Sequence, residues 1–237
     1  SSYIPQTSKA GFFELGDSPR KVYDFNVGWR FLRGDIEGAE RIDFDDSSWS
    51  VVVTPHTVQL MPAEASGSRN YQGKAWYRQH FTIDKNFKDK LINVYFEAVM
   101  GKSDVYVNGT KVLTHYGGYL PFSVELTALG LNPGAECVIA VMTDNSDDRN
   151  YPPGKKQATL DFAYHGGIYR DVWMVVTNRI HITDANKANK VKGGGVLVQY
   201  GEISKAKAEV QVSVDVDNKS LIGQRLLVLH KLVDKAG

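Results

Sequence analysis

Leu91-Ile92-Asn93-Val94-Tyr95-Phe96-Glu97-Ala98-Val99 is the stretch that decides the fold class of this 237-residue chain. Its residues alternate in character, so that Ile92, Val94, Phe96 and Ala98 share one face while Asn93, Tyr95 and Glu97 share the other. A period of two is the pattern of a strand that buries one face. The stretch therefore predicts a strand in a sheet that covers a core.

A predicted hairpin follows this strand. Val105-Tyr106-Val107 and Val112-Leu113 flank Asn108-Gly109, a dipeptide that readily adopts the positive φ angles of a two-residue turn. Many short strands and nearly no helical pattern predict an all-β fold built as a β-sandwich. The further strands, separated by segments rich in Gly, Pro, Asn and Asp, are predicted at residues 29–33, 75–83, 121–126, 136–143 and 171–177.

The composition changes near Arg179. All four tryptophans precede this residue, and Val, Ile, Leu and Lys dominate after it, with strands predicted at residues 196–200, 208–216 and 224–233 and a turn at 218–220. Three or four strands are too few for an immunoglobulin-like sandwich, which needs about seven. The uncovered sheet edge indicates a fragment of a longer protein or strands that pack on another surface. We therefore expect an N-terminal extension at residues 1–19, a first domain at 20–178 and a partial second domain at 179–237.

Charge and composition exclude several classes of partner. The 28 basic and 27 acidic residues give a formal net charge of +1, which is too small to attract nucleic acid or an anionic membrane. The apolar runs are far shorter than the roughly 20 residues that span a bilayer, so no membrane insertion is expected. Cys137, the single cysteine, lies in an apolar run, which predicts a buried, unreactive thiol. The six histidines lack a metal-ligand spacing, which argues against a zinc site.

Short motifs rich in aromatic residues follow one another along most of the chain. In their order and spacing they resemble the N-terminal region of glycoside hydrolase family 2, the family of β-galactosidases, β-glucuronidases and β-mannosidases. The motifs are Phe25-Asn26-Val27-Gly28-Trp29-Arg30-Phe31, Phe44-Asp45-Asp46-Ser47-Ser48-Trp49, Thr54-Pro55-His56, Gly73-Lys74-Ala75-Trp76-Tyr77-Arg78, Asp104-Val105-Tyr106-Val107-Asn108-Gly109, Gly117-Gly118-Tyr119-Leu120-Pro121-Phe122 and Gly166-Gly167-Ile168-Tyr169-Arg170-Asp171-Val172-Trp173.

The resemblance implies a jelly-roll sugar-binding domain at residues 20–178, followed by the first strands of an immunoglobulin-like domain. In the family, the acid/base and nucleophile glutamates lie on a (β/α)8 barrel further along the chain. A barrel needs about 250 residues of alternating strands and helices, and this pattern is absent here. No pair of acidic residues can be placed about 5 Å apart, as retaining hydrolysis requires. We therefore expect no catalytic residue in this chain.

The same resemblance implies the partners of the chain. It predicts the non-catalytic front of a retaining, exo-acting β-glycosidase, of β-galactosidase type, which shapes the pocket for a terminal β-linked sugar and braces the downstream catalytic barrel. Homo-oligomers are compatible with it. The resemblance to members from gut bacteria that act outside the cytoplasm implies a periplasmic or extracellular location, with the cytoplasm as the alternative. No cofactor is expected in this chain, whereas sodium or magnesium is implied for the parent enzyme.

Four loop residues are the predicted substrate contacts. The family spacing places Asp161 where an acidic residue holds the terminal sugar and, in some β-galactosidases, a sodium ion, because a carboxylate accepts strong hydrogen bonds from hydroxyls. A solvated loop acid is the alternative. Asn70 corresponds to a sugar-binding asparagine or is a turn residue. Tyr164 and His165, beside Gly166-Gly167, stack on or hydrogen-bond a sugar, or belong to the core.

Other conspicuous side chains have structural interpretations. The four tryptophans are predicted to supply core area rather than a sugar platform. Arg170 and Asp171 are neighbours in a strand, so we expect them to form ion pairs on opposite sides of the sheet. Asp104 and Glu97 are expected to pair with Arg78.

Two hypotheses from other classes remain beside the hydrolase. A stand-alone carbohydrate-binding, lectin-like module predicts affinity for free glycans and an exposed strip of aromatic residues. A structural interaction domain predicts that the open edge of the second domain recruits another chain.

Overall fold

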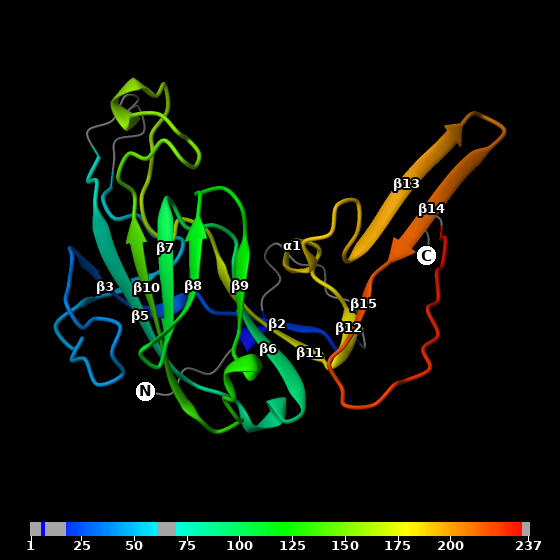
Figure 1. Ribbon diagram of the computed structural model, residues 1–237, viewed down its shortest axis with the longest axis horizontal. Helices are drawn as coiled ribbons and strands as arrows, with labels where there is room; N and C mark the ends of the chain where they lie inside the picture. The colour runs from blue at the N-terminus through cyan, green and yellow to red at the C-terminus, as the bar shows by residue number, and fades with distance from the viewer. Residues whose placement is uncertain (1–5, 8–17, 61–69, 234–237) are drawn as a thin grey trace.

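The computed structural model describes residues 6–7, 18–60 and 70–233, and its main body is a pair of antiparallel sheets (Figure 1). The first sheet has the strand order β1-β2-β11-β6-β9, formed by β1 (Gln6–Thr7), β2 (Lys21–Asp24), β11 (Val172–Asn178), β6 (Lys90–Phe96) and β9 (Phe122–Glu125). The second has the order β4-β3-β5-β10-β7-β8, formed by β4 (Ser50–Val53), β3 (Val27–Arg33), β5 (Lys74–Thr82), β10 (Glu136–Asp144), β7 (Lys102–Val107) and β8 (Thr110–Tyr116).

The core lies between the two sheets. Ile92, Val94 and Phe96 of β6 are fully buried, while the residues between them are half-buried on the other side of the sheet. Side chains of the second sheet, including Val105 and Val141, complete this core. Burying each large apolar side chain contributes roughly 1.5–3 kcal/mol, so the alternation read from the sequence accounts for the driving force. The predicted all-β fold and β-sandwich are confirmed, whereas the finer term jelly roll stays a prediction.

The predicted Asn108-Gly109 hairpin is present between β7 and β8. Asn108 has φ 48° and Gly109 has φ 83°, the positive angles that a tight turn of a twisted hairpin requires. The Asn108 side chain also accepts a 2.8 Å hydrogen bond from the Val138 backbone N–H, which ties the turn to β10.

All four tryptophans are buried, as predicted. Trp29 is fully buried in the core between the sheets. Trp173 is 1% exposed on the outer face of the first sheet, since its neighbours Val172 and Met174 belong to the core. Trp49 and Trp76 lie in a smaller cluster with Ala39 on the outer face of the second sheet. The segment from Gly34 to Trp49 thus covers part of the outer face of that sheet. Short 3-10 turns occur at η1 (Lys85–Phe87), η2 (Thr127–Leu129) and η3 (Gln157–Thr159).

Beyond Arg179 the chain forms two small strand pairs and one helical turn. β12 (Ile180–Ile182) pairs with β15 (Val216–Asn218), β13 (Val196–Ile203) pairs with β14 (Ala208–Val214), and α1 (Ala185–Ala188) lies between them in sequence. The strand predicted at 208–216 is therefore divided between β14 and β15. The domain boundaries and the immunoglobulin-like character of this part stay predictions.

The prediction of a strand at residues 224–233 is wrong. No strand forms there, and Leu227 and Leu232 are 91% and 95% exposed. An apolar run becomes a strand only when a neighbour accepts its backbone hydrogen bonds, and none is available to it in the described residues. No helix within the described ranges is long and apolar enough to cross a membrane.

Candidate functional site

The β10–β11 connection and the residues before β5, which carry the predicted site residues, meet at one end of the sandwich (Figure 1). The long connection from β10 to β11 contacts the residues that precede β5. Asn145, at the end of β10, is 1% exposed; its Oδ1 accepts a hydrogen bond from Gly73 N at 2.9 Å and its Nδ2 donates to Tyr71 O at 2.7 Å. Gln157, also 1% exposed, donates to the Asn145 carbonyl. These buried amides hold two loops together.

Gly166 and Gly167 allow the β10–β11 connection to pass close to its neighbours. A Cβ atom on Gly167 would lie 2.2 Å from the Tyr77 hydroxyl, and the residue has φ 90°. A Cβ atom on Gly166 would lie 2.5 Å from Asn145 Nδ2. The same segment receives backbone hydrogen bonds from His56 and Met100. The close backbone approach expected of this glycine pair is thus present, and it supports the adjacent Tyr164 and His165.

Asn70 and Tyr164 are in direct contact. The Asn70 side-chain Nδ2 donates to the Tyr164 carbonyl, and the residue is 8% exposed. Its Oδ1 is buried and has no partner among the described residues. The Tyr164 side chain is 2% exposed and packs with Met100 and Leu160, and its burial raises the pKa of the phenol. Its ring therefore occupies a core position, and only its backbone contributes to the loop contact.

His165 and Asp161 are more accessible. His165 is half-buried, with Nδ1 3.4 Å from Thr57 Oγ1. Asp161 is exposed, and the neighbouring Phe162 is 46% exposed. Within the ranges that the structure describes, no group of three His, Cys, Asp or Glu side chains lies together. Asp161 thus offers one carboxylate to a cation, and the sodium site stays a prediction that needs ligands from elsewhere.

Exposed tyrosines at the same end were not singled out from the sequence. Tyr116 is 59% exposed and its ring centroid lies 5.7 Å from that of Tyr151, and Tyr119 is 47% exposed. Tyr169 donates to the carbonyl of Gly118, which fixes the Tyr119 loop beside the site. The signal available in the sequence was the position of these tyrosines within Gly- and Pro-rich segments, where aromatic residues are not needed for strand packing.

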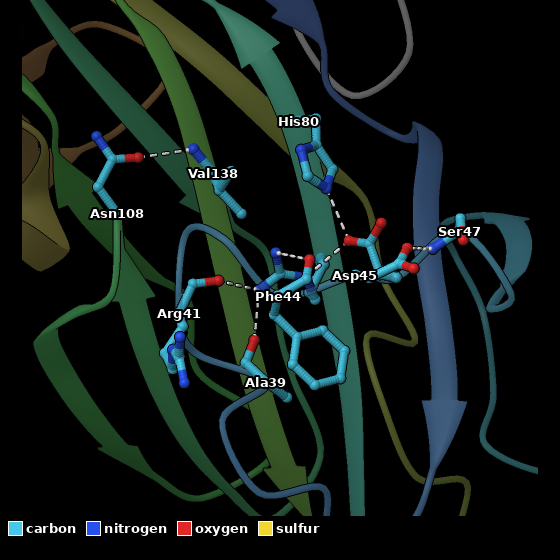
Figure 2. Close-up of polar contacts among 10 residues, drawn as sticks. Ala39, Arg41, Phe44, Asp45, Ser47, His80, Asn108 and Val138 are labelled. Carbon is cyan, nitrogen blue, oxygen red and sulfur yellow. Dashed lines mark hydrogen bonds and ion pairs between the residues drawn. The ribbon is translucent and has the colours of Figure 1, made fainter.

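A second polar cluster fastens the 34–49 segment to the sheet, and it corrects the expected pairing of Arg78 (Figure 2). Arg78 is fully buried, and its Nε donates to Asp46 Oδ2 at 2.7 Å. The Ala39 and Arg41 carbonyls converge on the same guanidinium, and His80 Nε2 lies 2.7 Å from Asp46 Oδ2. Burial works to raise the pKa of Asp46, but the hydrogen bonds from His80 and Arg78 together hold it below its ordinary value.

Arg78 therefore pairs with neither Asp104 nor Glu97, contrary to expectation. Asp104 pairs instead with lysines of its own hairpin, and Lys111 Nζ lies 2.8 Å from its carboxylate. Residues two apart in a strand share a face of the sheet, which also brings a lysine of the same strand beside Asp104. Asp46 reaches Arg78 because the 34–49 segment folds back over the sheet, which no local pattern indicates.

Of the ion pairs predicted for Arg170 and Asp171, the structure contains the one for Arg170. Arg170 Nε lies 3.0 Å from Glu97 Oε2, an ion pair between the residues that flank β11 and β6. Asp171 instead accepts a 3.0 Å hydrogen bond from Asn26 Nδ2 and has no ion pair within the described part of the chain. Burial, with the nearby Glu97, raises the pKa of Asp171. The buried thiol predicted for Cys137 is present, and burial raises its pKa to about 11.

Comparison with known sequences identifies close relatives. The β-galactosidase of Thermoanaerobacter pseudethanolicus is 31% identical over 218 residues, which covers 92% of this chain and 27% of the relative. A β-glucuronidase of Formosa agariphila is 30% identical over 237 residues, covering 94% of this chain and 24% of the relative. The chain thus spans about a quarter of the length of these relatives.

Solved structures and a family match agree with these relatives. Bacteroides uniformis β-glucuronidase 2, covalently bound to cyclophellitol-6-carboxylate aziridine, superposes with a TM-score of 0.73 at 29% identity, over 85% of this chain and 23% of that one. A putative β-galactosidase from Bacteroides fragilis gives 0.70 at 32% identity, over 86% and 29%. Residues 39–178 match the family described as glycosyl hydrolases family 2, sugar binding domain. The chain therefore belongs to glycoside hydrolase family 2 and forms the N-terminal region of its β-glycosidases.

Proposed function

We propose that this chain is the non-catalytic N-terminal part of a retaining, exo-acting β-glycosidase, of β-galactosidase type, and that its loops line one wall of the pocket for a terminal β-linked sugar. The carrying observation is the loop cluster at one end of the sandwich. Buried amides hold its backbone rigidly, Asn70 is bonded to the same cluster, and the carboxylate of Asp161 is exposed to a ligand.

Rigidity is what a pocket wall requires. A side chain can discriminate between sugars only when its position is held by packing and by further hydrogen bonds. Asn145 supplies these bonds for the segment before β5, Gln157 holds Asn145 in turn, and Gly166 and Gly167 supply close packing for the segment before β11. The ligating groups therefore extend from a scaffold that stays fixed while the substrate exchanges.

We assign one carboxylate of these loops, that of Asp161, to the sugar, and so propose a supporting role for the chain. Retaining hydrolysis needs two carboxyl groups about 5 Å apart, one of which is a nucleophile. At the loop end, Asp161 is exposed and is the only acid that we place against the sugar. We assign bond cleavage to a barrel elsewhere in the whole protein. The barrel is proposed because the relatives are much longer than this chain.

A hydrolysis assay tests this proposal directly. The isolated chain is incubated with nitrophenyl β-galactoside, β-glucuronide and β-mannoside, and release of nitrophenol is followed against buffer. We expect no turnover with any of the substrates. Turnover that survives repeated purification and scales with the concentration of the chain would refute the non-catalytic assignment.

The role of Asp161 is tested in the whole protein that we propose. Asp161→Asn removes a charged acceptor, so kcat/KM for the preferred β-glycoside is expected to fall about 10- to 100-fold. Asp89→Asn is the matched control, because Asp89 is exposed and has a positive φ that Asn tolerates. Equal kinetics for Asp161→Asn and the wild type would remove Asp161 from the pocket.

A lectin-like module is the second candidate, and the exposed tyrosines favour it. Tyr116 and Tyr119 present aromatic faces on which sugar C–H groups can pack. This reading predicts that the isolated chain binds free galactose or a β-galactoside with a Kd of about 1 mM or tighter, and that Tyr119→Ala weakens binding. The pocket-wall proposal predicts a Kd weaker than about 10 mM, because the other walls of the pocket are missing. Isothermal titration distinguishes the two.

A further inference from the structure

A cavity lies on the outer face of the first sheet, away from the loop end. It has a volume of about 130 Å³ and is bordered by strands β2, β6 and β11, by β12 and by α1. Because one water occupies about 30 Å³ in the liquid, this volume corresponds to about four water molecules. The cavity is thus too small for an oligosaccharide and suits a small molecule.

Two residues that line this cavity each carry a buried polar atom without a hydrogen-bond partner among the described residues. Thr177 points outward from β11, since its neighbour Val176 belongs to the core, and is nevertheless only 3% exposed. Its Oγ1 has no hydrogen-bond partner in the described part of the chain, and the same holds for Nδ1 of His181. Buried polar atoms are nearly always paired in folded proteins, so an unpaired hydroxyl beside a cavity indicates that something else binds there.

The cavity offers an anion one cationic side chain, that of Arg20. Lys187 also lines it but is paired with Glu125, and Asp184 adds a carboxylate. Arg20 Nη2 donates to Ile182 O at 2.6 Å, but none of the ion pairs formed among the described residues includes Arg20. Burial lowers the pKa of Arg20, and the neighbouring Asp184 opposes this effect only partly. A half-buried guanidinium with unused donors is a common partner for a carboxylate.

The rest of the wall suits a short carbon chain that carries hydroxyl groups. Val22 and Val175 provide apolar surface, and Tyr95 adds an aromatic ring. Burial lowers the pKa of His181, so its ring is neutral at pH 7 and has one donor and one acceptor nitrogen. Lys187 is exposed and ion-paired to Glu125.

We propose that this cavity binds a small hydroxy acid. Its carboxylate lies against the guanidinium of Arg20, its hydroxyl groups pair with Thr177 Oγ1 and His181 Nδ1, and its carbon chain contacts the valines. The site is separate from the loop end and does not depend on the glycosidase assignment.

D-Glycerate is the test ligand and glycerol is its neutral counterpart, because the two are similar in size and differ in the carboxylate. Each is titrated into the labelled chain, and the resonances of the Arg20 Nε–H, the Thr177 methyl group and the His181 ring are followed by NMR. We expect saturable shifts at these residues with glycerate, and about 10- to 100-fold weaker binding of glycerol. The resonances of Asn70 and Asp161 are expected to stay unchanged, which separates this site from the sugar site.

Two variants sharpen the test. Thr177→Val keeps the shape and removes the unpaired hydroxyl, so we expect weaker glycerate binding together with a higher Tm. A purely structural threonine would lose stability instead. Arg20→Gln is expected to abolish the preference for glycerate over glycerol, whereas Arg225→Gln, at an exposed arginine elsewhere, leaves it intact.

The proposal is overturned if glycerate causes no saturable shift up to about 100 mM, which would mean that only water fills the cavity. It is also overturned if glycerol binds as tightly as glycerate, or if Arg20→Gln leaves the preference unchanged. The wild-type comparison of the two ligands decides the matter even where a variant fails to fold.

Discussion

Replacing Asp46 with Asn removes the charge that balances a fully buried arginine. Arg78 is 0% exposed and its Nε donates to Asp46 Oδ2 at 2.7 Å, while the Asp46 side chain is 9% exposed. Asn has nearly the same shape as Asp, so the packing of the 34–49 segment is preserved. The change therefore isolates the electrostatic part of the contact.

The expected loss of stability follows from this geometry. Breaking a buried ion pair by removing one partner costs about 3–5 kcal/mol, because the remaining charge is left uncompensated. The carbonyls of Ala39, Arg41 and Phe44 still accept from the guanidinium, which places the cost at the lower end. We expect the free energy of unfolding to fall by about 3 kcal/mol. For a chain of this size, Tm falls by about 6–12 °C.

Urea unfolding followed by tryptophan fluorescence measures this change. Trp49 and Trp76 pack under the same segment, so their emission reports its release. Asp43→Asn is the matched control, since Asp43 pairs with Arg41 on the surface, where both side chains are more than 60% exposed. Surface pairs contribute little, so the control is expected to unfold with the wild type. Identical midpoints for Asp46→Asn and the wild type would refute the argument.

Acidification provides an independent check on the same carboxylate. The folded pKa of Asp46 lies below its ordinary value, so its contribution to stability is present above about pH 4 and is lost as pH falls through the folded pKa. The difference in stability between the wild type and Asp46→Asn is therefore expected to shrink below about pH 4. A difference that grows on acidification would show that the sign is wrong.

Other predictions concern packing and reactivity. Gly167→Ala is expected to lower Tm strongly, because its Cβ would lie 2.2 Å from the Tyr77 hydroxyl at a positive φ, whereas Gly223→Ala, with nothing within 4 Å, is expected to have little effect in the same thermal scan. The Cys137 thiol, with a pKa of about 11, is expected to react slowly with a disulfide reagent at pH 8 and rapidly in urea; equal rates would contradict its burial. Asn145→Ala removes two hydrogen bonds to the half-buried backbone of Tyr71 and Gly73 and is expected to cost about 2–3 kcal/mol in urea unfolding; a cost near zero would show that the loops hold together without it.

Residues that repeat with the period of a strand were predictable from the chain itself. The alternation in residues 91–99 identified the buried face of β6, and Asn108-Gly109 located the hairpin, because both depend on neighbours in sequence. The burial of the tryptophans followed from their position next to strands. The strand predicted at residues 224–233 does not form. Its local pattern is that of a strand, but a strand also needs a neighbouring strand, which the local pattern does not report.

The candidate site was partly predictable. The resemblance to glycoside hydrolase family 2 pointed to Asn70, Asp161, Tyr164 and His165, and the structure places them in one loop cluster. It did not indicate that the Tyr164 ring is buried or that Tyr119 is exposed, because exposure is decided by which loop covers which.

Local periodicity established the strands, their buried faces and the turn, because a strand repeats every two residues whatever surrounds it. The tertiary structure decided the rest. Arg78 pairs with Asp46 rather than Asp104, and Asn70 contacts Tyr164, which is 94 residues away in the sequence. Such contacts join positions whose separation in sequence carries no information about their separation in space, so only the packed structure reveals them.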